Sequence, residues 1–205
     1  FKGQEDALRY ALCSTAPETK DTDFTWADFQ ARNNNELVAI FGNFINRVVV
    51  LTNKYWQGVV PACNNLDDYD KNILEKLKEF PKKIGASIEK HHFRQALLEF
   101  MNLARLGNKY LADTEPWKLK KTDEKRTETI LNIAMQIAAS LAVLSEPFMP
   151  FSSNKLKEIL AINNIGWNDA GKKIISDNHK INPAIHLFNK IEDEKIEEQL
   201  EKLKN

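Results

Sequence analysis

Apolar residues recur along most of the chain at spacings of three and four, the pattern of helices that bury one face. Three short patterns cover residues 5–13, 96–104 and 152–162, and three longer ones cover residues 26–55, 70–93 and 122–145. The sequence shows no strand alternation of any length and no internal repeat. We therefore predict an all-α protein, an antiparallel helical bundle around one core.

Capping residues and prolines predict where these helices begin and end. Thr25 and Asp28 have the spacing of a capping box at the start of the first long helix. Pro81 is expected to kink or divide the next one, because proline removes a backbone donor. The helix over residues 122–145 is the most apolar and is predicted to be central.

Three parts are expected along the chain. Residues 1–24 form a junction helix and loop, residues 25–175 form the helical bundle, and residues 176–205 form an irregular return segment with a charged tail. The tail from Lys190 to Lys204 has enough Glu/Lys pairing for a solvated helix. The chain begins without Met and without a signal peptide, so we expect it to be a piece of a longer protein.

Charge and cysteine content narrow the classes of function. Lys+Arg and Asp+Glu both number 29, so a formal net charge of zero gives no general attraction to nucleic acid. Any RNA must be bound by a few placed groups. Cys13 and Cys63 have no Cys or His beside them, which excludes a zinc knuckle and favours a reducing cytosol. No apolar run approaches the ~20 residues of a membrane span, so no membrane is expected.

Motifs of catalysis are missing from the chain. The patterns G-x-x-x-x-G-K-[ST], G-x-G-x-x-G and H-E-x-x-H do not occur. His91 and His92 are adjacent, a spacing that does not suit a metal ion shared on one helix face. We expect no catalytic residue, no cofactor site and no metal site in these 205 residues.

The stretch GNKYLADTEPWKLKK, residues 107–121, carries a Trp at a predicted helix end ahead of a basic run. Pro116 is expected to push Glu115 into an extended conformation, so that the helix ends there and a rigid turn presents Trp117. An exposed indole can stack on any base, whereas a buried one would only close the end of the bundle. The residues alone leave both interpretations open.

Asn43 and Arg47 lie four residues apart on the first long helix, beside its apolar stripe. At this spacing the two side chains sit one above the other and can reach a common ligand. Asn and Arg supply the directional hydrogen bonds that read the edge of a base. The pair is therefore a candidate for binding RNA.

Four stretches resemble the methionyl-tRNA synthetase family. EDALRYAL, residues 5–12, carries the D-A-L-R signature of the anticodon-binding domains of several class I aminoacyl-tRNA synthetases. More specific are DFQARNNNELVAIFGNFINRVVVLTNKY, NKYLADTEPWKL and LSEPFMPFSSNKL. The resemblance extends from Asp6 to about Glu194 and implies the C-terminal, DALR-type anticodon-binding domain of that family.

The resemblance also implies roles for four residues. Trp117 would stack on the first base of the CAU anticodon of tRNA(Met), and Pro116 would hold its indole in place. Asn43 and Arg47 would contact the same cytosine. The implied partners are the anticodon loop and the catalytic domain of the same protein, with no DNA and a cytoplasmic location.

The family's H-I-G-H and K-M-S-K-S motifs are absent, so this fragment is expected to be inactive alone. The catalytic domain would lie in the missing part of the parent methionine–tRNA ligase. The resemblance implies that this domain binds ATP with Mg²⁺ and leaves open whether it also binds zinc. The helix over residues 6–12 would belong to the junction with that domain, and residues 183–194 resemble the strand-like segment that packs back toward it.

Two alternatives remain beside this interpretation. The chain could be the equivalent domain of a valyl, isoleucyl, leucyl or cysteinyl synthetase, although Asn43 and Arg47 beside the P-W-x-L motif argue against this. It could also be a helical protein–protein interaction domain without an RNA role, with Trp117 buried and the charged tail as a partner helix.

Overall fold

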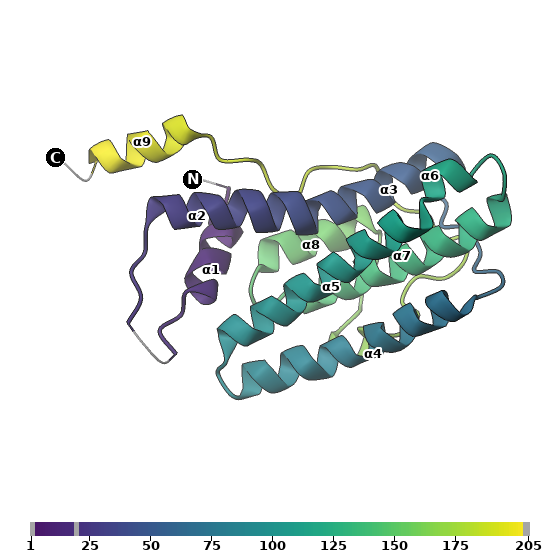
Figure 1. The fold of residues 1–205 in the computed structure, drawn as a ribbon, viewed down its shortest axis with the longest axis horizontal. Helices are drawn as coiled ribbons and strands as arrows, with labels where there is room; N and C mark the ends of the chain where they lie inside the picture. Colours follow the sequence, from purple (N-terminus) through teal and green to yellow (C-terminus); the bar gives the residue numbers. More distant parts are fainter. Residues whose placement is uncertain (1–2, 19–20, 203–205) are drawn as a thin grey trace.

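The structure is a computed structural model that describes residues 3–18 and 21–202 (Figure 1). Its helices, in chain order, are α1 (Glu5–Ser14), α2 (Trp26–Arg32), the π-helix η1 (Asn33–Gly42), α3 (Asn43–Trp56), α4 (Asp68–Glu89), α5 (Phe93–Thr114), α6 (Pro116–Leu119), α7 (Glu124–Leu144), α8 (Pro150–Ile159), the short 3-10 helix η2 (Trp167–Asp169) and α9 (Asp193–Lys202). The described residues contain no strand, only an isolated antiparallel bridge between Val59 and Lys180. The all-α prediction is confirmed.

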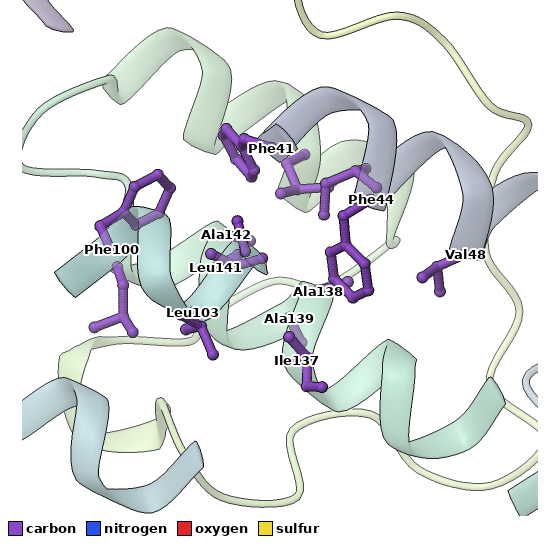
Figure 2. Packing of buried hydrophobic residues seen from close by; sticks show 14 of the residues in the cluster. Phe41, Phe44, Val48, Phe100, Leu103, Ile137, Ala138, Ala139, Leu141 and Ala142 are labelled. Carbon is purple, nitrogen blue, oxygen red and sulfur yellow. The ribbon is translucent and has the colours of Figure 1, made fainter. Parts of the chain in front are cut away.

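Helix α7 is the centre of the bundle, as predicted, and it contacts α3, α4, α5, α6 and α8. Every residue from Thr129 to Leu144 is buried. Figure 2 shows the rings of Phe41, Phe44 and Phe100 gathered around the alanine-rich middle of α7. Small side chains on the central helix let the neighbouring helices come close and fill the space with their own rings.

The expectation that no apolar run approaches the length of a membrane span is wrong for α7. This helix is long and apolar enough to cross a bilayer by length and composition, but 94% of its most apolar part is buried inside the bundle. Its composition therefore reflects its place in the core.

Elements α2, η1 and α3 form one continuous rod along the bundle (Figure 1). The prediction of a single long helix over residues 26–55 is correct in extent, but ten residues in the middle, Asn33–Gly42, are π-helical. A β-carbon at Gly42 would lie 3.0 Å from the carbonyl oxygen of Leu37, five residues earlier, so glycine suits this winding. Leu37 and Phe41 point into the core all the same, which is why the apolar stripe does not show the change.

The start of α2 is capped by Thr25, whose hydroxyl accepts a hydrogen bond from the backbone N–H of Asp28 at 3.1 Å. The Asp28 carboxylate does not complete a capping box, because it pairs with Arg32 at 2.7 Å. The predicted cap is therefore only half of the reciprocal motif.

Helix α4 runs unbroken through Pro81, so the expected division of this helix is wrong. Proline lacks the N–H that would bind the carbonyl of Leu77. Gly171, in the left-handed region at φ 81°, lies against that carbonyl: a β-carbon there would be 3.1 Å from the Leu77 oxygen. A distant glycine thus covers the place where the helix has lost a hydrogen bond.

The segment between α8 and α9 returns along the rod, but it is not a strand, so the strand-like expectation is wrong. The side-chain amide of Asn33 donates to the Asn189 carbonyl at 2.9 Å, and Asn34 exchanges hydrogen bonds with the backbone of Ile191. The Asn-rich stretch of the rod therefore binds the returning backbone through side chains rather than through a sheet ladder.

The charged tail forms α9, which packs on α2 (Figure 1). The tail was predicted to be a solvated helix. It is a helix, but its Ile196 side chain is buried, so it is solvated on only part of its surface. One hydrophobic cluster includes Ala7 and Tyr10 of α1 as well as Ile196 of α9. The division at residues 24 and 175 stays a prediction.

Candidate nucleic-acid interface

The interface is built around the corner between α5 and α6. Helix α5 ends at Thr114, and the Glu115 N–H donates to the Leu111 carbonyl at 3.0 Å. Glu115 has φ 42° and ψ 55°, so the expected extended conformation is wrong. A left-handed residue caps the helix and also avoids the right-handed conformation that Pro116 disfavours.

Replacing Glu115 with glycine is expected to keep or raise stability, because a left-handed non-glycine residue costs about 1–2 kcal/mol. Glu75→Gly is a matched control: Glu75 lies inside α4 and pairs with Lys78 at 2.6 Å, as Glu115 pairs with Lys118 at 2.7 Å. The control should lose about 1 kcal/mol, the usual cost of glycine within a helix. Thermal unfolding of both variants measures the difference, and equal losses would contradict strain at Glu115.

Trp117 projects from the first turn of α6 and keeps 36% of its surface exposed. The neighbouring Pro116 is buried and fixes the start of that turn. The guanidinium carbon of Arg47 lies 4.8 Å from the centroid of the indole ring. The corner therefore presents a partly exposed ring with a cation on one face.

Asn43 stands at the start of α3 and reaches across to α5. Its Nδ2 donates to Oδ1 of Asn108 at 3.2 Å, and Asn108 in turn donates to the Ile40 carbonyl at 2.9 Å. Because the rod is α-helical from Asn43 onward, Arg47 lies one turn further along the same face. The four predicted residues are thus gathered at one corner of the bundle, and Asn108 joins them.

Two of the three lysines that follow Trp117 are paired with carboxylates and are not free to bind a ligand. Lys118 pairs with Glu115, and Lys120 pairs with Glu124. In contrast, Arg47 has no hydrogen-bond or ion-pair partner among residues 3–18 and 21–202. The five N–H donors of this guanidinium are therefore free for a ligand.

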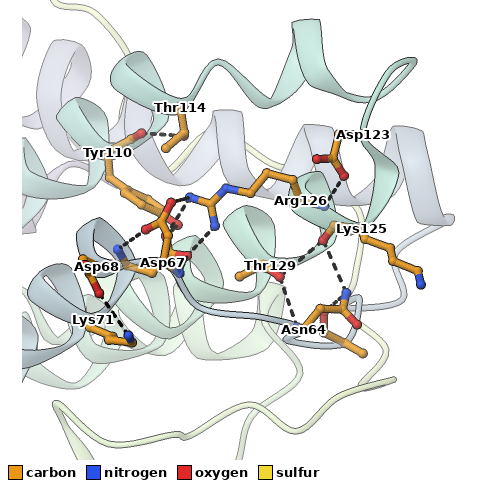
Figure 3. A network of polar contacts seen from close by, with 12 residues as sticks. Asn64, Asp67, Asp68, Lys71, Tyr110, Thr114, Asp123, Lys125, Arg126 and Thr129 are labelled. Atoms are coloured by element: carbon orange, nitrogen blue, oxygen red, sulfur yellow. Dashed lines mark hydrogen bonds and ion pairs between the residues drawn. The ribbon is translucent and has the colours of Figure 1, made fainter.

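Of the residues one turn before the corner, Tyr110 is fully buried and points away from solvent. Its hydroxyl donates to Asp70 at 2.6 Å, in a network with Arg126 and Asp67 that ties α4, α5 and α7 together (Figure 3). Tyr110 therefore stabilises the packing of the helices beneath the corner and is not part of the exposed surface.

Two residues that shape this corner, Gly107 and Asn108, had no role in the candidate site predicted from the sequence. A β-carbon at Gly107 would lie 2.5 Å from the ring of Phe44, so glycine lets α3 and α5 cross closely. The hydrogen bond of Asn108 to Asn43 depends on this closeness. A glycine inside a predicted helix is the one signal in the sequence that could have pointed here.

The two cysteines are half-buried and free. Burial raises the pKa of the Cys13 thiol and of the Cys63 thiol, which disfavours the reactive thiolate. No group of three His, Cys, Asp or Glu side chains suited to a metal ion occurs in the part of the chain that the structure describes.

Matches to known proteins now identify the family. Residues 60–205 match the family described as "Anticodon binding domain of methionyl tRNA ligase", and residues 2–49 match "tRNA synthetases class I (M)". The chain belongs to the methionyl-tRNA ligase family. Within it, residues 60–205 are the anticodon-binding domain, and residues 2–49 belong to the class I synthetase part that precedes it.

Bacterial methionyl-tRNA ligases are similar over the whole chain. The methionine–tRNA ligase of Cytophaga hutchinsonii is 57% identical over 206 residues, and that of Christiangramia forsetii is 58% identical over 211 residues. These matches cover 100% and 99% of this chain but only 30% of each relative. The chain therefore spans less than a third of the length of these two relatives.

The fold also has a solved counterpart. The free form of Mycobacterium tuberculosis methionyl-tRNA synthetase superposes with a TM-score of 0.83 over 91% of this chain and 39% of that one, at 22% sequence identity. At this identity the likeness concerns the helical fold. It agrees with the all-α bundle described above.

Proposed function

We propose that this domain of methionyl-tRNA ligase reads the first base of the CAU anticodon, so that the rest of the parent protein can join methionine to tRNA(Met) in the cytoplasm, using ATP with Mg²⁺. Trp117 is the stacking platform, Pro116 holds it, and Asn43 and Arg47 contact the edge of the cytosine. The observation that carries the proposal is the unpaired guanidinium of Arg47 on a partly exposed indole, one helical turn from Asn43.

The energies favour exchange of the guanidinium for a base. An exposed cation–π contact is worth about 0.5–1 kcal/mol, whereas stacking of a base on an aromatic ring is worth about 1–3 kcal/mol. Arg47 breaks no hydrogen bond to a described residue when it leaves the ring. Once displaced, its donors are free to bind the acceptors on the edge of the same base.

The family match sets aside a valyl, isoleucyl, leucyl or cysteinyl enzyme and gives no support to a domain without an RNA role. It also fits the zero net charge of the chain, because one loop of RNA read by a few groups needs no broad basic surface. The remaining affinity for tRNA would come from other parts of the parent protein.

Titration of an RNA hairpin with a CAU loop tests the proposal. Trp117→Ala, and replacement of the first loop base by uracil, should each weaken binding by about tenfold or more, or ~1.4 kcal/mol. The control is Trp167→Ala, because Trp167 is a half-buried tryptophan that packs beside Gly85 of α4. Equal binding of both hairpins, unaffected by the loss of the Trp117 ring, would refute the proposal.

A further inference from the structure

The side-chain amide of Asn108 has only one orientation that satisfies its neighbours. Its Nδ2 lies 2.9 Å from the carbonyl oxygen of Ile40 and 3.2 Å from that of Ala104. Backbone carbonyl oxygens only accept hydrogen bonds, so both contacts require the nitrogen of the amide. The oxygen of Asn108 must therefore face the other way, toward Asn43.

This orientation fixes Asn43 in turn. The Asn108 oxygen can only accept, so Asn43 presents Nδ2 to it, at 3.2 Å. Oδ1 of Asn43 then has no hydrogen-bond partner among the described residues, and Asn43 is exposed. The chain of hydrogen bonds that starts at two backbone carbonyls thus ends in a free acceptor next to the platform formed by Trp117 and Arg47.

We propose that Asn108 is the positioning residue for base discrimination: it holds the carbonyl oxygen of Asn43 toward the ligand, where it accepts from the exocyclic amino group of cytosine. This inference rests on the proposed function and adds the cause of its selectivity. Asn108 acts through Asn43.

Cytosine and uracil differ at the group that this acceptor meets. Cytosine carries a donor amino group, whereas uracil carries a carbonyl oxygen at the same position. Uracil would set two acceptors against each other. To donate to uracil instead, the Asn43 amide would have to turn over, which would bring its oxygen against the oxygen of Asn108. The fixed orientation therefore opposes uracil by a lost hydrogen bond and by repulsion.

The test is the ratio of dissociation constants for a hairpin with a UAU loop and one with a CAU loop. The wild-type chain should prefer the CAU loop by about tenfold or more, the usual scale of one well-placed hydrogen-bond contact. Asn108→Ala should bring the ratio close to one, because a freed Asn43 amide can turn to suit either base. Asn108→Ser, which cannot reach both backbone carbonyls, should act in the same way and serves if the alanine variant folds poorly.

Two controls separate a positioning role from a structural one. Trp117→Ala should weaken both hairpins and leave the ratio unchanged, because stacking does not distinguish the two pyrimidines. Asn102→Ala, on the same helix, removes an asparagine whose side chain, among the described residues, accepts only from Arg105, and the ratio should stay at the wild-type value.

The outcomes are distinguishable. If the wild-type ratio is high and the Asn108 variants keep it while binding both hairpins less tightly, Asn108 is only a structural link and the inference is wrong. If the wild-type chain itself binds both hairpins equally, the proposed function fails and the inference fails with it.

Discussion

Replacing Asp70 with alanine is expected to lower the free energy of unfolding by about 3 kcal/mol, because the buried Tyr110 hydroxyl loses its partner and the partly buried Arg126 side chain keeps Asp67 as its only described partner. The Asp70 carboxylate is fully buried and accepts hydrogen bonds from Arg126 and from the Tyr110 hydroxyl. It also accepts from the backbone N–H of Asp67 at 3.1 Å and so completes the capping box of α4. Without this carboxylate, Arg126 and Tyr110 lose the acceptor that they share. The hydrogen bonds that connect α4 to α5 and α7 through Asp70 are then lost.

Urea unfolding measures the loss, and Asp68→Ala is the matched control. Asp68 lies in the same first turn of α4, but its side chain is fully exposed, and within the part of the chain that the structure describes it pairs only with Lys71. The control should remain close to wild type, since exposed ion pairs contribute little. Similar stability of the two variants would mean that the buried network (Figure 3) does not hold the bundle together.

The pH dependence gives a second check on Asp70. Burial by itself raises the pKa of this carboxyl, but the hydrogen bonds from Arg126, Tyr110 and the Asp67 backbone outweigh it and hold the pKa below its ordinary value. A lowered pKa in the folded state stabilises the protein above the unfolded-state pKa of about 3.9. This stabilisation is lost as the pH falls through the folded-state value. The stability gap between wild type and Asp70→Ala should therefore be full at neutral pH and shrink in acid.

The features that the sequence predicted well are those that depend on neighbours along the chain. The apolar spacing was enough to find most of the helices and the central position of α7, and Pro116 marked the end of α5. The break between α4 and α5 was not predicted: the pattern over residues 70–93 runs across it. Asn43 and Arg47 share a face because they lie four residues apart in regular α-helix. Relations of this kind need no knowledge of the tertiary structure.

The features that the sequence did not predict depend on residues far apart in the chain. Helix α4 passes unbroken through Pro81, and Gly171, ninety positions later, packs on the freed Leu77 carbonyl. The π-helix η1 is invisible to the apolar stripe, since Leu37 and Phe41 are buried with either winding. Asn108 is 65 residues from Asn43, and only the crossing of α3 and α5 brings them together.

The left-handed backbone conformation of Glu115 could not be predicted from the sequence either. Glutamate ordinarily avoids the left-handed region, so a residue before proline is best predicted as extended. In the structure the N–H of Glu115 still binds the Leu111 carbonyl, which closes the last turn of α5. The rigid corner that presents Trp117 therefore depends on a strained residue whose strain is balanced by a helix cap.

Replacing Gly107 with alanine is expected to destabilise the protein by about 1–3 kcal/mol, the range of overpacked cores. The new methyl group would lie 2.5 Å from two ring carbons of Phe44, which is fully buried among core side chains. Alanine would otherwise favour the helix by about 1 kcal/mol, so the measured loss understates the clash. Gly85→Ala is the matched control: it lies inside α4, and its methyl would make an ordinary 3.4 Å contact with Trp167, so it should be neutral or stabilising.

The same substitution should also weaken the reading of the base, because Gly107 precedes Asn108 and Phe44 follows Asn43. Any widening of the crossing between α3 and α5 lengthens the 3.2 Å hydrogen bond between the two asparagines. Gly107→Ala, studied at a temperature where it is folded, should therefore lose part of the preference for the CAU hairpin, while Gly85→Ala keeps it. If Gly107→Ala is as stable as wild type, Phe44 does not set the distance between the helices; if it is unstable but discriminates fully, the crossing and the base reading are independent.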